Sequence, residues 1–235
     1  MIKTTPTMSE MMRMDALRNV AFLNGATRTE LDQLVEYSEI LVLKKFEILY
    51  RKGDITDAVF HVHSGMMKVS TVVNQGKEVI RAIAHPGMLL GEGVLSGVSR
   101  QTATSQSLDR QTKILEIKAV ALRRLMMTNA EVAVSYMDYI ALKLQKSARR
   151  LESVIAEDAR TRVIKFLMEN ANKYGNKVGY NELLLKHNFT QQDIADFTGT
   201  SRQTVTTILN DLKRSNLIAM NRRRILIRNV KEMAS

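Results

Sequence analysis

The sequence predicts an α+β protein with an antiparallel β-sandwich or barrel first, a long helix next and a small, mainly helical domain last. Three observations support this fold class. Glycines separate short β-forming runs in the first half, glycine and proline are absent from Asn129 to Ile155, and the last part combines helical periodicity with two short apolar runs. We therefore expect a β domain over residues 1–128, a long helix and hinge over 129–157, and a third domain over 158–235.

The composition is that of a globular chain with a strong positive charge. Of 235 residues, 45% are hydrophobic and 25% are charged, and the net charge of +11 favours a polyanionic partner, either nucleic acid or an acidic membrane surface. Because the chain has no cysteine, disulfides, thiolate zinc sites and cysteine-ligated iron–sulfur clusters are excluded. The N-terminus lacks the features of a signal peptide, and no apolar run approaches the ~20 residues of a membrane helix. We expect a soluble, cytoplasmic protein without a membrane partner.

The first domain is predicted from its strand and turn signals. Four runs with β-forming residues, "AVFHVHSG", "MMKVSTVV", "KEVIRAIA" and "QTKILEIK", lie between turn signals such as "NQG" and "HPG". A short helix over Thr29–Ser38, capped by Thr29, is expected before them. The methionines near the N-terminus are expected to fill core gaps or to cover an amphipathic turn; they are Met8, Met11, Met12 and Met14.

The segment after Asn129 has the apolar spacing of a coiled-coil helix. Ala130 and Ala133 begin a series that steps by three and four residues for more than three heptads, which predicts a helix packed against a parallel partner. A homodimer is the simplest outcome, and the alternative is an amphipathic helix that lies on its own domain. The expected dimer-interface residues are Met137, Ile140, Leu144, Ser147, Leu151 and Val154.

The stretch "TQQDIADFTGTSRQTVTTILNDLKRSNLI" has the spacing of a helix-turn-helix. Ala195 follows Gln191 by four residues and precedes Gly199 by four, so a small residue lies where the helices cross and a glycine lies where the turn needs a positive φ. Two capping pairs are expected, Thr190 with Asp193 for the first helix and Thr200 with Gln203 for the second. The alternative is a helical hairpin used only for packing.

The second helix of this motif is predicted to contact DNA, because a helix-turn-helix places the N-terminal end of that helix in the major groove. Arg202 suits guanine, Gln203 suits adenine, and the nearby hydroxyls suit phosphates. Basic residues are concentrated towards the C-terminus, where two β-like runs around residues 221–223 predict a small hairpin. The predicted DNA-contacting residues are Thr190, Ser201, Arg202, Gln203, Thr204, Thr206, Thr207, Arg222, Arg223 and Arg224.

Three motifs together resemble the CRP/FNR family of bacterial transcription regulators: "YRKGDITDAVFHVHSGMMKVS", "GEGVLSG" and the helix-turn-helix stretch above. The resemblance covers nearly the whole chain. It implies a cupin-like β-roll (a double-stranded β-helix, or jelly roll) that senses an effector, a dimerisation helix, and a winged helix-turn-helix with the three arginines 222–224 on the wing. It also implies a homodimer that binds a palindromic operator in double-stranded DNA, contacts RNA polymerase, and acts as an activator or a repressor.

The same resemblance implies where an effector would bind. Gly91-Glu92 matches a pair in the cyclic-nucleotide-binding members, whose glutamate meets the ribose and whose arginine, further on, meets the cyclic phosphate. Gln101 stands in the place of that arginine, and Arg100 lies one residue early. A cyclic nucleotide effector and a β-roll without this ligand both remain open. The expected effector-site residues are Gly91, Glu92, Arg100, Gln101, Thr102 and Ser147.

Two histidines, His61 and His63, would share one face of a strand, which resembles half of a cupin metal site. No carboxylate follows them at a suitable distance, so we expect structural histidines and no metal site. The spacing of His61, His63 and His85 does not support axial ligation of haem. We expect a regulator rather than an enzyme, with or without a small-molecule effector, whose sensor acts through the long helix and a hinge at Ala156–Asp158. The alternative from another class is a cupin-type metalloenzyme with an accessory DNA-binding domain.

Overall fold

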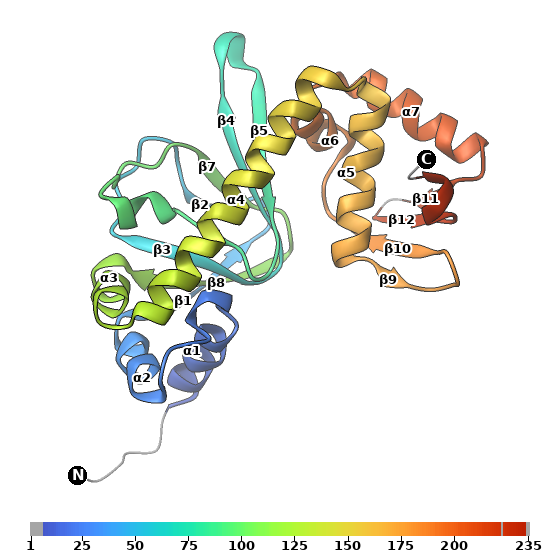
Figure 1. Ribbon diagram of the computed structural model, residues 1–235. Coiled ribbons are helices and arrows are strands. Elements are labelled where there is room, and N and C mark those ends of the chain that lie inside the picture. The colour runs from blue at the N-terminus through green and yellow to red at the C-terminus, as the bar shows by residue number, and fades with distance from the viewer. Residues whose placement is uncertain (1–6, 222, 234–235) are drawn as a thin grey trace. The chain divides into compact units, whose positions relative to one another are not determined.

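The computed structural model describes residues 7–221 and 223–233, which fold into two compact units (Figure 1). The first unit comprises the chain up to Gly76 together with Arg81–Gln145, and the second comprises Lys77–Ile80 together with the chain from Lys146 onward. The predicted α+β architecture is confirmed, because a β-roll, a long helix and a winged helix-turn-helix follow one another along the chain. The boundary between the two compact units falls inside the long helix, and the expected three-part division stays a prediction.

The β-roll consists of two four-stranded antiparallel sheets. In the first sheet the order is β1 (Ser38–Lys44), β8 (Gln111–Lys118), β3 (Ala58–Ser64) and β6 (Leu89–Leu90). In the second sheet the order is β2 (Ile48–Tyr50), β7 (Thr104–Ser107), β4 (Met67–Val72) and β5 (Glu78–Ala84). Two short 3-10 turns, η2 (Asn74–Gly76) and η3 (Glu92–Ser96), lie in the connections. Four of the strands, β3, β4, β5 and β8, occupy the runs that the sequence predicts, whereas β1, β2, β6 and β7 lie outside those runs.

Alternation along the strands divides the buried side chains between two cores. Ile114 of β8 and Val62 of β3 pack with residues of the second sheet, such as Met67, in the interior of the roll. The next residue of β8, Leu115, belongs to a separate core that the first sheet forms with helices. Neighbouring strand residues point to opposite faces, so one sheet supplies both cores.

Helices cover the outward face of the first sheet. They are α1 (Met8–Arg18), η1 (Ala21–Leu23), α2 (Arg28–Glu36), α3 (Ala119–Thr128) and the start of α4 (Ala130–Ala156). The expected cap at Thr29 is wrong, because the Thr27 hydroxyl accepts from the Glu30 backbone N–H and the Glu30 carboxylate accepts from the Thr27 amide. The same reciprocal pairing between Thr7 and Glu10 begins α1, where the sequence had predicted at most an amphipathic turn.

The predicted long helix is α4, which spans 27 residues. Its first half is anchored to the first unit: Val132 is fully buried, and the ring of Tyr136 meets that of Phe22 edge to face at 5.2 Å. The Asn129 amide, just before α4, donates to the Gly25 carbonyl at 3.2 Å. No helix in the described part of the chain is long and apolar enough to cross a membrane.

The second unit contains the predicted helix-turn-helix and hairpin. Its helices are α5 (Ala159–Tyr174), α6 (Gln191–Thr198), α7 (Arg202–Arg214) and α8 (Val230–Met233). Its sheet has the order β11 (Ile218–Asn221), β12 (Arg224–Ile227), β10 (Leu183–Lys186) and β9 (Asn176–Lys177). The core side chains Leu167, Leu185 and Val205 are almost completely buried, so α5, the sheet and α7 are packed together.

Candidate DNA interface and effector site

The turn between α6 and α7 has the geometry that the sequence predicts. The Thr190 hydroxyl accepts from the Asp193 backbone N–H at 3.1 Å, and the Asp193 carboxylate accepts from the Thr190 amide at 2.7 Å, which fixes the start of α6. Ala195 is fully buried in the crossing of the two helices. Gly199 ends α6 with a φ of 68°, a conformation that costs other residues free energy.

The expected capping box at the start of α7 is wrong by one residue. Ser201, and not Thr200, is the N-cap, because its backbone is extended and its hydroxyl accepts from the Thr204 backbone N–H at 3.0 Å. The hydroxyls of Ser201 and Thr204 are also 2.8 Å apart. Both hydroxyls therefore help to begin the helix, in addition to any phosphate contact that the sequence predicts for them.

The N-terminal turn of α7 presents an exposed polar face. Arg202, Gln203 and Thr207 are exposed, and Gln203 and Thr207 lie one turn apart on the same face of the helix. Thr206 lies differently, since its hydroxyl donates to Gln191 Oε1 of α6 at 2.7 Å. Thr206 thus joins the two helices of the motif, a role that the sequence did not suggest.

A pocket of 320 Å³ lies beside this face. Its lining comes from the start of α6 and the start of α7; the lining residues are Thr190, Gln191, Gln192 and Arg202. Backbone N–H groups at the two helix starts and the Arg202 guanidinium together favour an anion at this place. Thr190 and Arg202 are among the predicted DNA-contacting residues, whereas Gln191 and Gln192 are not, because only the helix crossing reveals their position.

Two arginines hold the C-terminal end of α6. Arg150 of α4 donates to the Phe197 carbonyl at 2.6 Å, and its guanidinium lies 3.9 Å from the centre of the Phe197 ring. Arg162 of α5 donates to the Thr198 carbonyl at 2.8 Å. Carbonyls at a helix C-terminus lack partners within the helix and carry partial negative charge, so two cations satisfy them. These contacts connect α4 and α5 directly to the helix-turn-helix.

The predicted hairpin is confirmed as β11 and β12, which pair antiparallel. Arg223 and Arg224 are exposed at its turn. Arg222, the third predicted wing residue, lies outside the described residues. The DNA-contacting roles of these residues stay predictions.

The expected effector residues Gly91 and Glu92 lie at the start of η3, where Glu92 meets α4. The Glu92 carboxylate forms an ion pair with the Lys143 ammonium, and these two side chains are 22% and 33% exposed. Lys143 also donates to the Leu89 carbonyl at 3.4 Å, while the Leu89 amide donates to the Tyr139 hydroxyl at 2.9 Å. Burial and the Glu92 charge raise the pKa of Tyr136 to about 12. Glu92 therefore faces a polar stripe of α4.

Gln101 and Arg100, the two candidates for the phosphate position, differ in burial: Gln101 is buried and Arg100 is exposed. Gln101 is 8% exposed, and its amide donates to the Thr56 hydroxyl at 2.6 Å; it lies so close to Gly91 that a Cβ there would be 3.1 Å from the amide nitrogen. Arg100 is exposed and donates to the Gly53 carbonyl at 2.7 Å. The structure thus separates Arg100 from Gln101, although neither residue lies in one of the named strands.

Thr102 has a cationic partner that the sequence did not identify. Arg81 of β5 donates to the Thr102 hydroxyl at 3.0 Å. Ser147, the remaining effector candidate, is an exposed residue in the half of α4 that belongs to the second unit.

The predicted dimer residues form an exposed apolar stripe on α4. Met137, Leu144, Leu151 and Val154 are between 45% and 70% exposed. Ile140 is half-buried and Ser147 is exposed. A stripe of this length is unusual on a free helix surface and suits a partner helix.

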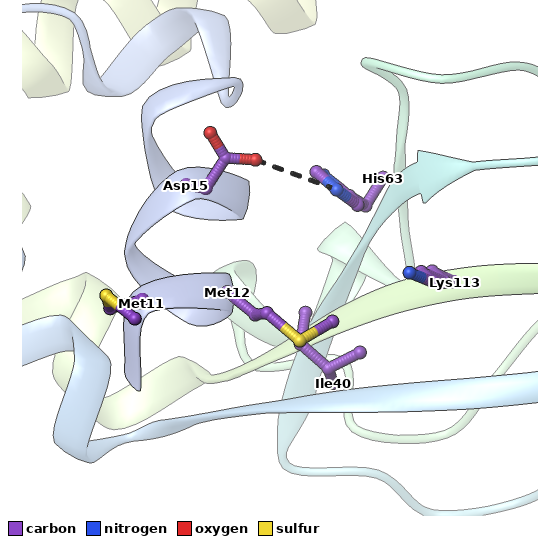
Figure 2. A pocket seen from close by; sticks show the side chains of 6 residues that line it. All are labelled: Met11, Met12, Asp15, Ile40, His63 and Lys113. Carbon is purple, nitrogen blue, oxygen red and sulfur yellow. Dashed lines mark ion pairs between the residues drawn. The ribbon is translucent and has the colours of Figure 1, made fainter. Parts of the chain in front are cut away.

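The two histidines of β3 differ in burial and in partners. His61 is fully buried on β3, and burial together with His63 lowers its pKa to about 4. His63 Nε2 lies 3.9 Å from an Asp15 carboxylate oxygen (Figure 2). Within residues 7–221 and 223–233, no three His, Cys, Asp or Glu side chains come together as a metal site requires.

Comparison with known proteins gives two family models in succession along the chain. A model of the cyclic nucleotide-binding domain matches residues 40–129, and a model of the Crp-like helix-turn-helix domain matches residues 161–235. The class of protein is thus a helix-turn-helix protein with an N-terminal domain of the cyclic-nucleotide-binding type. The chain belongs to the CRP/FNR family.

Individual relatives agree with this assignment. The chain is 24% identical over 225 residues to the CRP-like cAMP-activated global transcriptional regulator of Mycobacterium tuberculosis, covering 94% of this chain and 97% of that protein. It is 22% identical to the fumarate and nitrate reduction regulatory protein of Vibrio cholerae, covering 90% and 82%. The solved structure of FixK2 from Bradyrhizobium japonicum has the same fold, with a TM-score of 0.75, 20% identity, and coverage of 83% and 95%.

Proposed function

We propose that the protein is a homodimeric, sequence-specific DNA-binding transcription regulator whose β-roll domain controls its DNA-binding domain. The exposed N-terminal turn of α7 supports this function most directly, because Arg202, Gln203 and Thr207 are presented together beside an anion-favouring pocket. The net charge of +11 supplies the non-specific attraction to the phosphate backbone. RNA polymerase is the expected protein partner, and the cytoplasm the expected location.

The dimer is proposed through the apolar stripe of α4. Two parallel copies of this helix would bury Leu144 and Leu151 against their equivalents and place two α7 helices about a two-fold axis. Such a pair of recognition helices reads a palindromic operator, with half-sites separated by about one or more helical turns of DNA.

The contacts of Glu92 favour one form of this regulator, in which no cyclic nucleotide is needed. Lys143 already neutralises the carboxylate that a ribose would need, and Gln101 has no charge to offer a cyclic phosphate. We propose that Lys143 remains paired with Glu92 in the functional protein. Contacts within the chain would then keep the candidate effector site in its shape without a ligand. A ribose hydroxyl would have to share this carboxylate with the ammonium, which makes a cyclic nucleotide the less favoured candidate.

Selection of operators from random duplexes tests the proposed DNA recognition. Full-length protein is expected to enrich a palindromic site, and Arg202→Ala to lose about 1–3 kcal/mol of discrimination between that site and scrambled DNA while keeping salt-sensitive binding. Lys213→Ala is the matched control, because Lys213 is an exposed cation in the last turn of the same helix. Equal discrimination by Arg202→Ala and wild type would show that Arg202 does not read bases.

Calorimetric titration with cyclic AMP and cyclic GMP separates the two forms of regulation. Absence of binding supports a regulator without a cyclic nucleotide effector. Submicromolar binding that Glu92→Gln abolishes would overturn that form and leave the DNA-binding function intact.

A further inference from the structure

A pocket of 350 Å³ lies between α1 and the outward face of the first sheet (Figure 2). Its lining comes from four elements: Met11, Met12 and Asp15 of α1, Ile40 of β1, His63 of β3 and Lys113 of β8. Strand pairing explains why Ile40 and Lys113 share one face. Ile40 lies opposite Leu115 and Lys113 lies opposite Val42, and residues 113 and 115 alternate onto the same side of β8.

The polar groups of this pocket are incompletely paired. Lys113 makes no ion pair with any residue in the described part of the chain, although it lines a half-enclosed space. The Nδ1 atom of His63 is buried and has no hydrogen-bond partner among these residues. Asp15 is directed at the other ring nitrogen, His63 Nε2, and so the one carboxylate of the pocket is already engaged. The Lys113 ammonium is therefore available to a ligand.

The remaining lining is apolar. Met12 and Ile40 lie next to each other below the Asp15–His63 pair, and Met11 lies further along α1 (Figure 2). Met11 and Met12 are 48% and 39% exposed, so covering them would remove apolar surface from water. Thioether side chains adapt to ligands of varied shape.

We propose that this pocket binds a small carboxylate with a short aliphatic tail. The ligand carboxylate pairs with the Lys113 ammonium, and its tail lies along Met12 and Ile40. His63 can give a second hydrogen bond from Nδ1, which has no hydrogen-bond partner in the described part of the chain. A volume of 350 Å³ is at the small end of the range for ligand pockets, which fits a single aliphatic chain.

A ligand bound in the pocket would stabilise the packing of α4. The buried face of α1, with Met14 and Leu17, belongs to the same core as Val132 of α4. A ligand that stabilises α1 on the sheet therefore stabilises the core on which the first half of α4 rests. The site is separate from Glu92 and Gln101, so its existence does not depend on the proposed DNA-binding function.

Titration of full-length protein labelled at its methionine methyl groups tests the site. Hexanoate is expected to shift the methyl resonances of Met11 and Met12 saturably, and each methylene from butyrate to hexanoate to tighten binding about three- to fourfold. Hexanol has the same tail without the charge and is expected to bind at least about tenfold more weakly. The proposal fails if no carboxylate gives saturable shifts at these methyl groups, or if hexanol binds as tightly as hexanoate.

Variants locate the ligand within the pocket. Lys113→Met is expected to weaken hexanoate binding at least about tenfold. Lys44→Met removes a cation from β1 that does not line the pocket, and unchanged binding is expected. Met12→Ala keeps every charge, and should weaken hexanoate more than butyrate because only the longer tail reaches the thioether. Equal effects of Lys113→Met and Lys44→Met would overturn the proposal; if Lys113→Met does not fold, equal effects of Met12→Ala on the two ligands would overturn it as well.

Discussion

Lys143, on the long helix, neutralises Glu92, the first residue of η3, across 51 residues of sequence. The pair lies close to the end of the first compact unit, which closes at Gln145. With Tyr139 bound to the Leu89 amide one helical turn earlier, it gives the β-roll two polar contacts to the same face of α4. The two contacts join the β-roll to α4 at residues 139 and 143.

Removal of Lys143 is expected to weaken the first unit. Lys143→Met leaves the partly buried Glu92 carboxylate without its ammonium, at a cost of about 1 kcal/mol in the free energy of unfolding. Glu92→Gln is expected to cost a similar amount, and the double variant less than the sum, because the second change then removes a group that has lost its partner. Urea denaturation of the four proteins measures this coupling. Strictly additive losses would show that the pair contributes nothing to stability.

Arg150 is expected to stabilise the DNA-binding motif from α4. Arg150→Met keeps most of the apolar stem but removes the charged hydrogen bond to the Phe197 carbonyl and the contact with the Phe197 ring. We expect a loss of about 1.5–3 kcal/mol in the free energy of unfolding of the second unit. Differential hydrogen exchange of α6 amides is the measurement. Arg149→Met, a change at the exposed neighbouring arginine, should leave that exchange unchanged.

The apolar stripe of α4 predicts how the oligomer will dissociate. Leu144→Glu and Leu151→Glu together place four carboxylates in the proposed helix pair, so a monomer is expected by sedimentation at micromolar protein concentration. Leu142→Glu is the control, since Leu142 is 58% exposed and lies off the stripe. If Leu142→Glu dissociates the dimer and the double variant does not, the interface lies on another face of α4.

His61 predicts a loss of stability in acid. Its pKa is lowered to about 4 by burial, whereas an unfolded histidine titrates near 6.5, so the unfolded state binds more protons between these values. The contribution is fully present above about pH 6.5 and falls by about 3 kcal/mol as the pH drops to about 4. His61→Phe is expected to flatten this part of the curve of unfolding free energy against pH. A variant with the wild-type slope would exclude His61 as its cause.

Part of that slope is expected to persist in the variant. Burial also lowers the pKa of His187 in the second unit, next to Phe189. Denaturation followed separately in the two units assigns each histidine its share.

Features of the fold that depend on residues close together in the sequence could be predicted from local patterns. The glycine at 199, the Thr190–Asp193 pair and the unbroken spacing of α4 all act within a few residues, and the structure has these features where the sequence placed them. The sequence also contains the Thr7–Glu10 signal of α1, identical in spacing to Thr27–Glu30. That signal was missed because charged residues interrupt the apolar ones in α1.

The contacts of the candidate effector site were not predictable in the same way. Lys143 was one of several charged residues beside an apolar stripe, and nothing local connects it to Glu92. Arg81 reaches Thr102 only because β5 and the loop before β7 are brought together by the sheet. A one-residue displacement of Arg100 could be seen in the sequence, but the new partners of Thr102 and Glu92 required the tertiary fold.

The dependence of the N-terminal helices on Asn129, Val132 and Tyr136 has a consequence for synthesis of the protein. Gly25 and Phe22 receive these partners only after more than a hundred further residues have been translated. At the usual 5–20 residues per second this interval is roughly 5–20 s, during which Phe22 and its apolar neighbours lack the cover of α4. The segment around Phe22 is therefore among the last parts of the first unit to be buried, and a chaperone that binds the nascent chain would find its target there.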